Sequence, residues 1–351
     1  MKGEEKSCVL LNVGSSADHP IKASLIEGLI DEAIVTPIEI RPNPAWKTMS
    51  FCEVGQDVTA QLNGKRLKVN FVLFRCPVLR ENIQGITPLT RELITDFDSK
   101  IALKHNSEIA MWTAWFYGDS QGVPAIFSRG IPTSRLPEFK RYTGHPEIKN
   151  SCFSHWETVE GVAMHEGIDV FLLVMLGGGN GIYGWENNGI SAYKIRQWDG
   201  PMSLSSIGAI DTLSLLDHFL GRGETDLKEV RNEIGNLAGK TGGLQMYKPE
   251  WGDLKKFRED VEKDNPDPLA KTLFQNMVYQ IAGKMGEVNC LMESKIQKPV
   301  FFFGGGANWP YLRESIIDRF PPHFFYKFEN VDYDPEMEFF ISQAKEFAAT
   351  L

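Results

Sequence analysis

Three glycine-rich turns, each directly after an apolar run, constrain the fold of this chain more than any other feature. The runs are LLNVGSS at 10–16, FLLVMLGGGNGI at 171–182 and VFFFGGGANW at 300–309. Glycine has no Cβ, so a buried strand that ends in glycines lets backbone N–H groups approach a phosphate closely. One such turn alone is more typical of a tight connection. Three in succession favour a protein that binds a polyphosphate.

The length of the chain predicts two domains. At 351 residues it exceeds the size at which one hydrophobic core usually keeps growing. We therefore expect domains at 1–140 and 141–351, with the ligand site in a cleft between them. We place the helix predicted at 335–349 in the second domain because of its place in the sequence. Whether it packs on the first domain stays open. Both halves repeat an apolar strand, a glycine turn and a second strand, which indicates a duplicated α/β architecture with mixed sheets.

Composition excludes several classes of protein. The net charge of -9 argues against a nucleic-acid-binding protein, which normally carries a basic excess. No apolar run approaches the roughly 18 residues that span a bilayer. The five cysteines are scattered without CxxC spacing, so reduced thiols are expected in place of disulfides or a zinc site. The charged start MKGEEKSC lacks the apolar core of a signal peptide, which favours a cytoplasmic protein.

Hydrophobic periodicity predicts the remaining elements. A hairpin is expected around YGWENNGISAYKI, with Asn187, Asn188 and Gly189 at its tip. The run LKKFREDVEKD at 254–264 is interpreted only as a solvated helix face, and the aromatic run at 112–117 as helix packing. Further strands are expected at 22–27, 69–75 and 123–127, and further helices at 88–104, 108–118, 156–165 and 268–288.

Several segments in order resemble the acetate and butyrate kinase family, and especially butyrate kinases. They are LPEFKRYTGHPEI, MLGGGNGI, DGPMSLSSIG, GKTGGLQMY, LAKTLFQNMVYQIAGKMGEV, FFGGGANWPYLRE and DYDPEMEFFISQAKEFA. The resemblance implies the fold of the acetate-sugar kinase, Hsc70 and actin superfamily: two actin-like (ribonuclease H-like) domains with mixed sheets flanked by helices. It also implies ATP or ADP with Mg²⁺, phosphoryl transfer to or from a small carboxylic acid, and a homodimer.

The resemblance also implies the residues of the site. Phosphoryl transfer needs backbone donors, cations and a metal placed around the phosphates. The implied catalytic residues are Arg75, Arg141 and His145, and the implied metal ligands are Glu336 and Glu338. The implied nucleotide-binding residues are Asn12, Gly14, Ser15, Gly177, Gly178, Gly179, Gly242, Gly243, Gly304, Gly305, Gly306 and Asn308.

Three positions depart from the family pattern. Met175 stands where the family has a histidine, Ser206 where it has an arginine, and Ser128 or Arg129 where it has an aspartate. Without the histidine and the arginine, the site lacks positive charge that commonly stabilises the transition state by several kcal/mol. Arg129, Arg135 and Arg141 are the candidates to replace that charge.

Three functions therefore stay open. The first is an ATP-dependent carboxylate kinase-like enzyme. The second is a catalytically degenerate nucleotide-binding protein with a regulatory or assembly role. The third is a kinase with a hydroxyl acceptor, which needs a general base that the sequence does not place. A metal cluster of His145, His155 and His165 is disfavoured, because a spacing of ten residues does not put them on one helical face.

Overall fold

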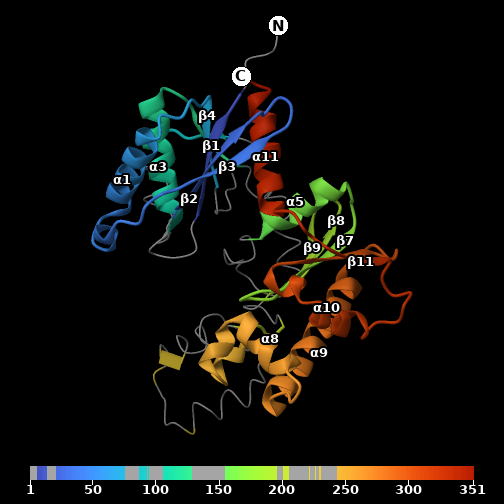
Figure 1. The fold of residues 1–351 in the computed structure, drawn as a ribbon. Coiled ribbons are helices and arrows are strands. Elements are labelled where there is room, and N and C mark those ends of the chain that lie inside the picture. Colours follow the sequence, from blue (N-terminus) through green and yellow to red (C-terminus); the bar gives the residue numbers. More distant parts are fainter. Residues whose placement is uncertain are drawn as a thin grey trace. The chain divides into compact units, whose positions relative to one another are not determined.

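The computed structural model describes residues 6–13, 21–75, 87–92, 94, 106–128, 155–195, 201–204, 221, 226, 229–230 and 243–351 (Figure 1). The chain divides into two compact units. The first unit comprises Met1–Ser134 and Glu336–Leu351, and the second comprises Arg135–Pro335. Each unit contains one mixed sheet flanked by helices.

The sheet of the first unit has the order β3-β2-β1-β4-β6-β5. Its strands are β1 (Cys8–Val13), β2 (Ile21–Glu27), β3 (Ile34–Ile38), β4 (Phe71–Phe74), β5 (Thr87–Pro88) and β6 (Ala125–Phe127). The first three strands form an antiparallel meander, and β4 and β6 continue the sheet parallel to β1. β4 and the first four residues of β1 are buried on both faces and form continuous apolar runs.

Helices cover both faces of this sheet. On one face lie α1 (Phe51–Gly64) and α3 (Asn106–Gln121), which pack against Val9 and Leu11 of β1. On the other face α11 (Pro335–Ala348) packs Phe339 and Phe340 against Cys8 and Leu10, the alternate residues of the same strand. The C-terminal helix therefore completes the core of the first unit. The aromatic residues of α3 are packing residues as predicted, and Tyr117 is fully buried.

The second unit repeats the scheme with the order β9-β8-β7-β10-β11. Its strands are β7 (Phe171–Met175), β8 (Gly181–Glu186), β9 (Gly189–Ile195), β10 (Pro299–Phe303) and β11 (Lys327–Asn330). Again three strands, β7, β8 and β9, form an antiparallel meander. β10 pairs parallel to β7, and β11 pairs parallel to β10. Asn187 and Asn188 both have positive φ in the predicted hairpin turn. The duplicated mixed-sheet, actin-like architecture is confirmed.

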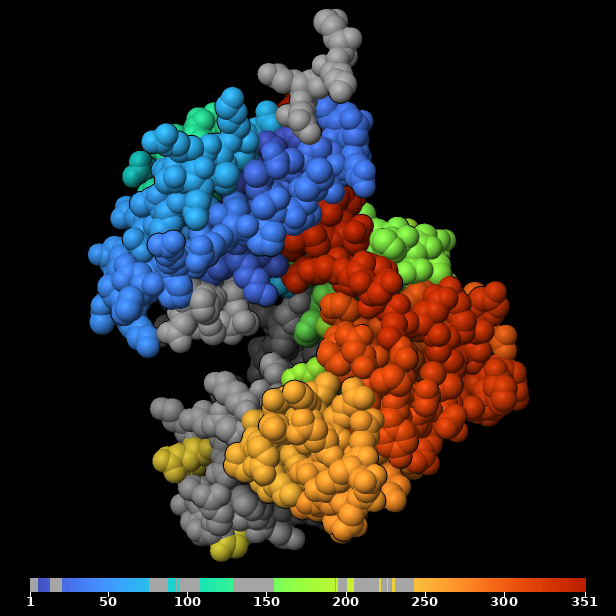
Figure 2. Space-filling view, in the orientation of Figure 1, coloured from blue at the N-terminus to red at the C-terminus, as the bar shows by residue number. Residues whose placement is uncertain are grey.

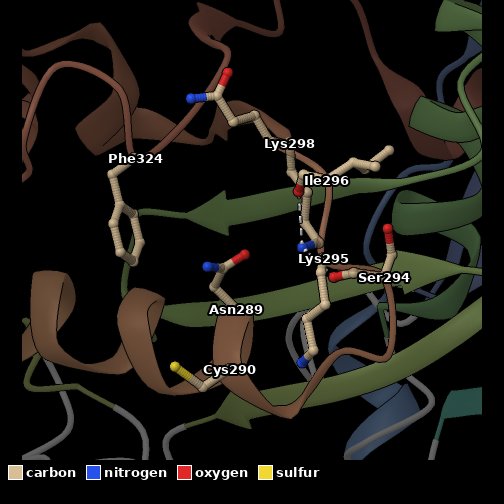
Figure 3. Close-up of a pocket in the computed structure, with 8 residues that line it drawn as sticks. Asn289, Cys290, Ser294, Lys295, Ile296, Lys298 and Phe324 are labelled. Atoms are coloured by element: carbon tan, nitrogen blue, oxygen red, sulfur yellow. Dashed lines mark hydrogen bonds between the residues drawn. The ribbon is translucent and has the colours of Figure 1, made fainter.

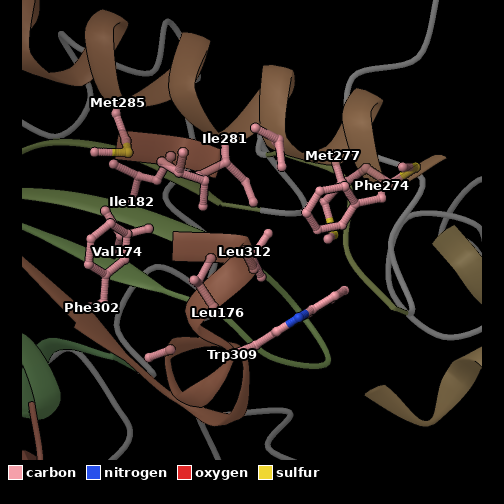
Figure 4. Close-up of a cluster of buried hydrophobic side chains, with 14 of the residues drawn as sticks. Val174, Leu176, Ile182, Phe274, Met277, Ile281, Met285, Phe302, Trp309 and Leu312 are labelled. Atoms are coloured by element: carbon pink, nitrogen blue, oxygen red, sulfur yellow. The ribbon is translucent and has the colours of Figure 1, made fainter. Parts of the chain in front are cut away.

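One long helix organises the core of the second unit. α9 (Pro268–Leu291) begins at Asp267, whose side chain accepts from the N–H groups of Leu269 and Ala270. In Figure 4 its residues Met277, Ile281 and Met285 point toward the side chains of the sheet. Other elements of this unit are α5 (Trp156–Glu166), η4 (Gly243–Met246), η5 (Pro249–Gly252), α8 (Leu254–Glu262), η6 (Gly305–Asn308) and α10 (Pro310–Ile317).

Two predictions of secondary structure were wrong in part. The expected helix from residue 88 does not begin there, because Thr87 and Pro88 form β5 at the edge of the sheet, where proline is tolerated. α8 is more than a solvated face: its outer side lies at the surface (Figure 2), but Phe257 and Val261 are buried in the core. No helix within the described ranges is long and apolar enough to span a membrane.

Candidate functional site

The two glycine turns of the second unit lie side by side. β7 and β10 are adjacent and parallel, so both turns leave the same edge of the sheet, where α/β proteins commonly bind ligands. Leu176 joins them: its N–H donates to the Phe303 carbonyl at 2.8 Å, and its carbonyl accepts from the Gly306 N–H at 2.9 Å. The two turns are therefore one hydrogen-bonded structure.

Gly304 and Gly306 are required by the packing of the chain itself. Gly304 has a φ of +95°, and a Cβ there would lie 2.6 Å from the Leu176 carbonyl oxygen. A Cβ at Gly306 would lie 2.7 Å from the Cβ of Leu176. These two glycines have a structural explanation that needs no ligand.

Gly177 and Gly178 have no such explanation. A Cβ at either position would meet no atom of the described residues within 4 Å, and neither glycine has a positive φ. Space and backbone conformation would thus allow other residues at both positions. What a side chain here would obstruct is the open space beside the turn, which a ligand requires if it is to approach the backbone closely.

Two further segments hold this turn. The Gly177 N–H donates to Asn180 Oδ1 at 3.0 Å, and Asn180 Nδ2 donates to the Met202 carbonyl at 2.7 Å. Ser203 Oγ donates to the Gly178 carbonyl at 2.8 Å. The Ser203 carbonyl in turn accepts from the N–H of Leu244 in η4.

The glycine positions predicted in three segments of this unit are therefore joined through hydrogen bonds. They are 177–179, 243, and 304–306, and Gly243 is buried with a φ of +73°. Asn180 and Ser203 were not predicted from the sequence. The only signal was an asparagine directly after the glycines and a serine in the DGPMSLSSIG segment.

The turn after β10 is fixed on its other side by Trp309. The indole Nε1 donates to Glu262 Oε1 at 2.6 Å, and the ring packs against Phe274 with 5.1 Å between centroids. Gly305 and Asn308, two of the implied nucleotide-binding residues, are exposed on this corner. A buried tryptophan thus supports exposed backbone, an arrangement suited to a binding surface.

In the first unit the predicted catalytic arginine and a predicted metal ligand form an ion pair. Arg75 follows β4, and one of its terminal nitrogens lies 2.6 Å from Glu336 Oε1 on α11. The same nitrogen donates to Asn12 Oδ1 of β1 at 3.4 Å. The side chains of Arg75 and Glu336 are only 12% and 28% exposed, so solvent screens this pair weakly.

The metal prediction gains limited support from these contacts. Glu336 already binds a guanidinium, and Glu338 lies half-buried on the same first turn of α11. Within the described part of the chain, no three His, Cys, Asp or Glu residues gather into a cluster that could hold a metal ion. Mg²⁺ is commonly held by one or two carboxylates together with substrate phosphates, so a Mg²⁺ site does not require three protein ligands.

The other predicted positions fall into two groups. Gly14, Ser15, Arg141, His145 and Gly242, together with Arg129, Arg135 and Ser206, lie outside the described residues. Ser128 is fully buried after β6, and Met175 is half-buried at the end of β7. His155 Nδ1 lies 2.9 Å from the Tyr183 hydroxyl, and His165 stacks on Tyr333. These two histidines therefore have packing partners of their own.

A pocket of about 230 Å³ lies elsewhere in the second unit (Figure 3). Its lining comes from the end of α9, the loop before β10 and the loop before β11, and it includes none of the glycine turns. The buried Lys298 donates to the carbonyls of Ser294 and Ile296 at 2.7 and 3.2 Å, and burial lowers its pKa. This lysine holds the loop together, so we assign it a structural role.

No protein-family model matches the chain. The probable butyrate kinase 2 of Caldanaerobacter subterraneus subsp. tengcongensis is 20% identical over 263 residues, which cover 72% of this chain and 72% of that protein.

Solved structures share the fold. The acetate kinase of Entamoeba histolytica superposes with a TM-score of 0.65 at 13% identity, over 97% of this chain and 99% of that chain. A propionate kinase from Francisella tularensis subsp. tularensis gives a TM-score of 0.62 at 15% identity, over 97% and 98%. At 20% identity the chain is similar in sequence to a butyrate kinase, and it shares the fold of an acetate kinase and a propionate kinase.

Proposed function

We propose that the protein is a carboxylate kinase-like phosphotransferase. It would move the γ-phosphoryl group of ATP to the carboxylate of a small organic acid, giving an acyl phosphate and ADP, or catalyse the reverse. The observation that carries this proposal is that a Cβ at Gly177 or Gly178 would meet no described atom within 4 Å, beside a turn that hydrogen bonds to Asn180 and Ser203 hold. The relationship to butyrate, acetate and propionate kinases supports the same reaction class.

The second unit supplies the nucleotide side of this proposal. The backbone of the turn 177–179 approaches the phosphates, and the exposed corner at Gly305 and Asn308 contacts the nucleoside. Backbone donors suit a reaction in which catalysis is mostly positioning and charge stabilisation. Bound Mg²⁺ would neutralise charge on the phosphates. Glu336 and Glu338, which belong to the first unit, stay the predicted carboxylates for it.

The first unit supplies the acid-binding side. Arg75 already binds a carboxylate, that of Glu336, and Asn12 accepts from the same guanidinium. A substrate carboxylate is the same chemical group, and arginine binds it with charge-assisted hydrogen bonds. We assign to Arg75 the role of orienting the acid, with Arg141 and His145 as proposed neighbours in the reaction.

The test is acid-dependent release of ADP. The purified protein is incubated with Mg-ATP and acetate, propionate, butyrate or a branched acid, and the acyl phosphate is trapped with hydroxylamine as a hydroxamate. We expect ADP and hydroxamate to appear together with at least one acid and to fall to background in Arg75→Ala. Equal ADP release with and without every acid would contradict transfer, and nucleotide binding without transfer would indicate the degenerate alternative. The expected homodimer stays a prediction, which light scattering tests.

A further inference from the structure

We propose that Asn180 is a positioning residue that sets the shape of the glycine turn 177–179. The inference rests on the proposed function, because its purpose is to present the turn to a polyphosphate. The Asn180 side chain forms hydrogen bonds to the backbone of Gly177 and of Met202, and it is only 5% exposed. Asn180 is therefore placed to act through the turn and not on the ligand itself.

An amide is the group that this position needs. Asn180 Oδ1 accepts from the Gly177 N–H at 3.0 Å, while Nδ2 donates to the Met202 carbonyl at 2.7 Å. The asparagine side chain presents this acceptor and this donor on one planar amide. The peptide between Leu176 and Gly177 is thus held at both of its polar groups: its N–H by Asn180 and its carbonyl by the Gly306 N–H. Asn180 supplies the half of this restraint that lies within the turn.

The segment 201–204 connects this amide to the core. The Met202 N–H donates to Gln280 Oε1 of α9 at 2.9 Å, so the residue that Asn180 holds is itself held by the long helix. Ser203 Oγ fastens the turn at a second point, the Gly178 carbonyl. The turn is thus held at an N–H by Asn180 and at a C=O by Ser203. Sites built on loops depend on such supporting contacts for their precision.

Asparagine substitutions separate this role from general stability. Asn180→Ala removes the acceptor and the donor, while Asn180→Asp keeps an acceptor for Gly177 but loses the donor and adds a negative charge beside the turn. The matched control is Asn43→Ala in the first unit. Asn43 also accepts from a backbone N–H, that of Ala45 at 3.0 Å, and donates to Asp57 at 3.2 Å. That variant loses comparable hydrogen bonds in a region with no proposed ligand.

Calorimetric titration with Mg-ATP, Mg-ADP and adenosine is the first readout. We expect Asn180→Ala to lower the affinities for ATP and ADP by about tenfold or more, which corresponds to the loss of roughly one hydrogen bond. The affinity for adenosine should fall by less than about twofold. Asn180→Asp should lower the affinities for ATP and ADP further. Asn43→Ala should leave the affinities for ATP, ADP and adenosine unchanged. Wild-type affinity for ATP in Asn180→Ala would overturn the inference, as would an equal loss for adenosine.

Amide hydrogen exchange is the second readout and needs no nucleotide. In Asn180→Ala the Gly177 amide should exchange faster than in wild type, at a temperature where both proteins are folded. Unchanged exchange would overturn the claim that Asn180 holds the turn. If wild type binds no nucleotide, the proposed function fails, and the exchange experiment still decides the claim about Asn180.

Discussion

Alanine at two glycine positions should give opposite results, because the structure explains one glycine by packing and the other by open space. In Gly304→Ala the new Cβ would lie 2.6 Å from the Leu176 carbonyl oxygen at a φ of +95°. Backbone strain and overpacking each cost about 1–3 kcal/mol, so we expect a loss of roughly 2–6 kcal/mol in the free energy of unfolding. For a unit of about 200 residues, at about 2–4 °C per kcal/mol, this lowers the melting temperature by about 4–24 °C.

Gly178→Ala should leave stability almost unchanged. Its Cβ would meet no described atom within 4 Å, and its φ is not positive. Replacement of glycine by alanine at a compatible position changes stability by only about 0.4–1 kcal/mol, in the stabilising direction. The melting temperature should therefore stay within about 4 °C of wild type.

Thermal unfolding with and without Mg-ATP measures both effects. Saturation at about 100 times Kd stabilises a protein by about 2.7 kcal/mol, so wild type should melt several degrees higher with nucleotide. Gly178→Ala should lose that increase while it melts normally without ligand. The reasoning is refuted if Gly178→Ala keeps the full increase, or if Gly304→Ala melts like wild type.

Three further predictions concern the ion pair, the last helix and a buried carboxylate. Arg75→Ala leaves the Glu336 carboxylate without its guanidinium, so urea unfolding should show a loss of roughly 1–3 kcal/mol, and an unchanged midpoint would contradict the pair's role. Phe340→Ala should cost about 3–5 kcal/mol, since this fully buried ring packs on the first sheet; a loss under about 1 kcal/mol would mean that α11 does not complete that core. Burial raises the pKa of Glu186, but the N–H groups of Ser294 and Glu293 outweigh it and hold the pKa below its ordinary value. Stability from this carboxylate is present above that ordinary value and lost as the pH falls through the folded-state pKa, so Glu186→Gln should show a shallower acid dependence of unfolding than wild type. Superimposable acid curves would exclude this contribution.

Local signals in the sequence were sufficient for much of the fold. Apolar runs that end in glycine marked β7 and β10, and the amphipathic pattern marked α9 almost to its ends. Asn187 and Asn188 marked the hairpin because both tolerate positive φ. The repeated strand and turn pattern then predicted two similar sheets.

Relations between distant residues were beyond the reach of those signals. Nothing local distinguishes Gly304, which packs on Leu176, from Gly178, which borders open space. The pairing of Arg75 with Glu336 depends on α11 packing on the first sheet, which the sequence left open.

The interpretation of α8 failed for a related reason. Its charged residues dominate the pattern, while the buried Phe257 and Val261 matter only through partners elsewhere in the chain. A short amphipathic helix with few apolar residues looks solvated until the surface it covers is known.

A crystal structure with Mg²⁺ and a non-hydrolysable ATP analogue tests the central claim most directly. We predict phosphate oxygens within hydrogen-bonding distance of backbone N–H groups in the turn 177–179, with Asn180 still bound to Gly177 and Met202. A nucleotide bound away from this turn, or no nucleotide at saturating concentration, would contradict the account.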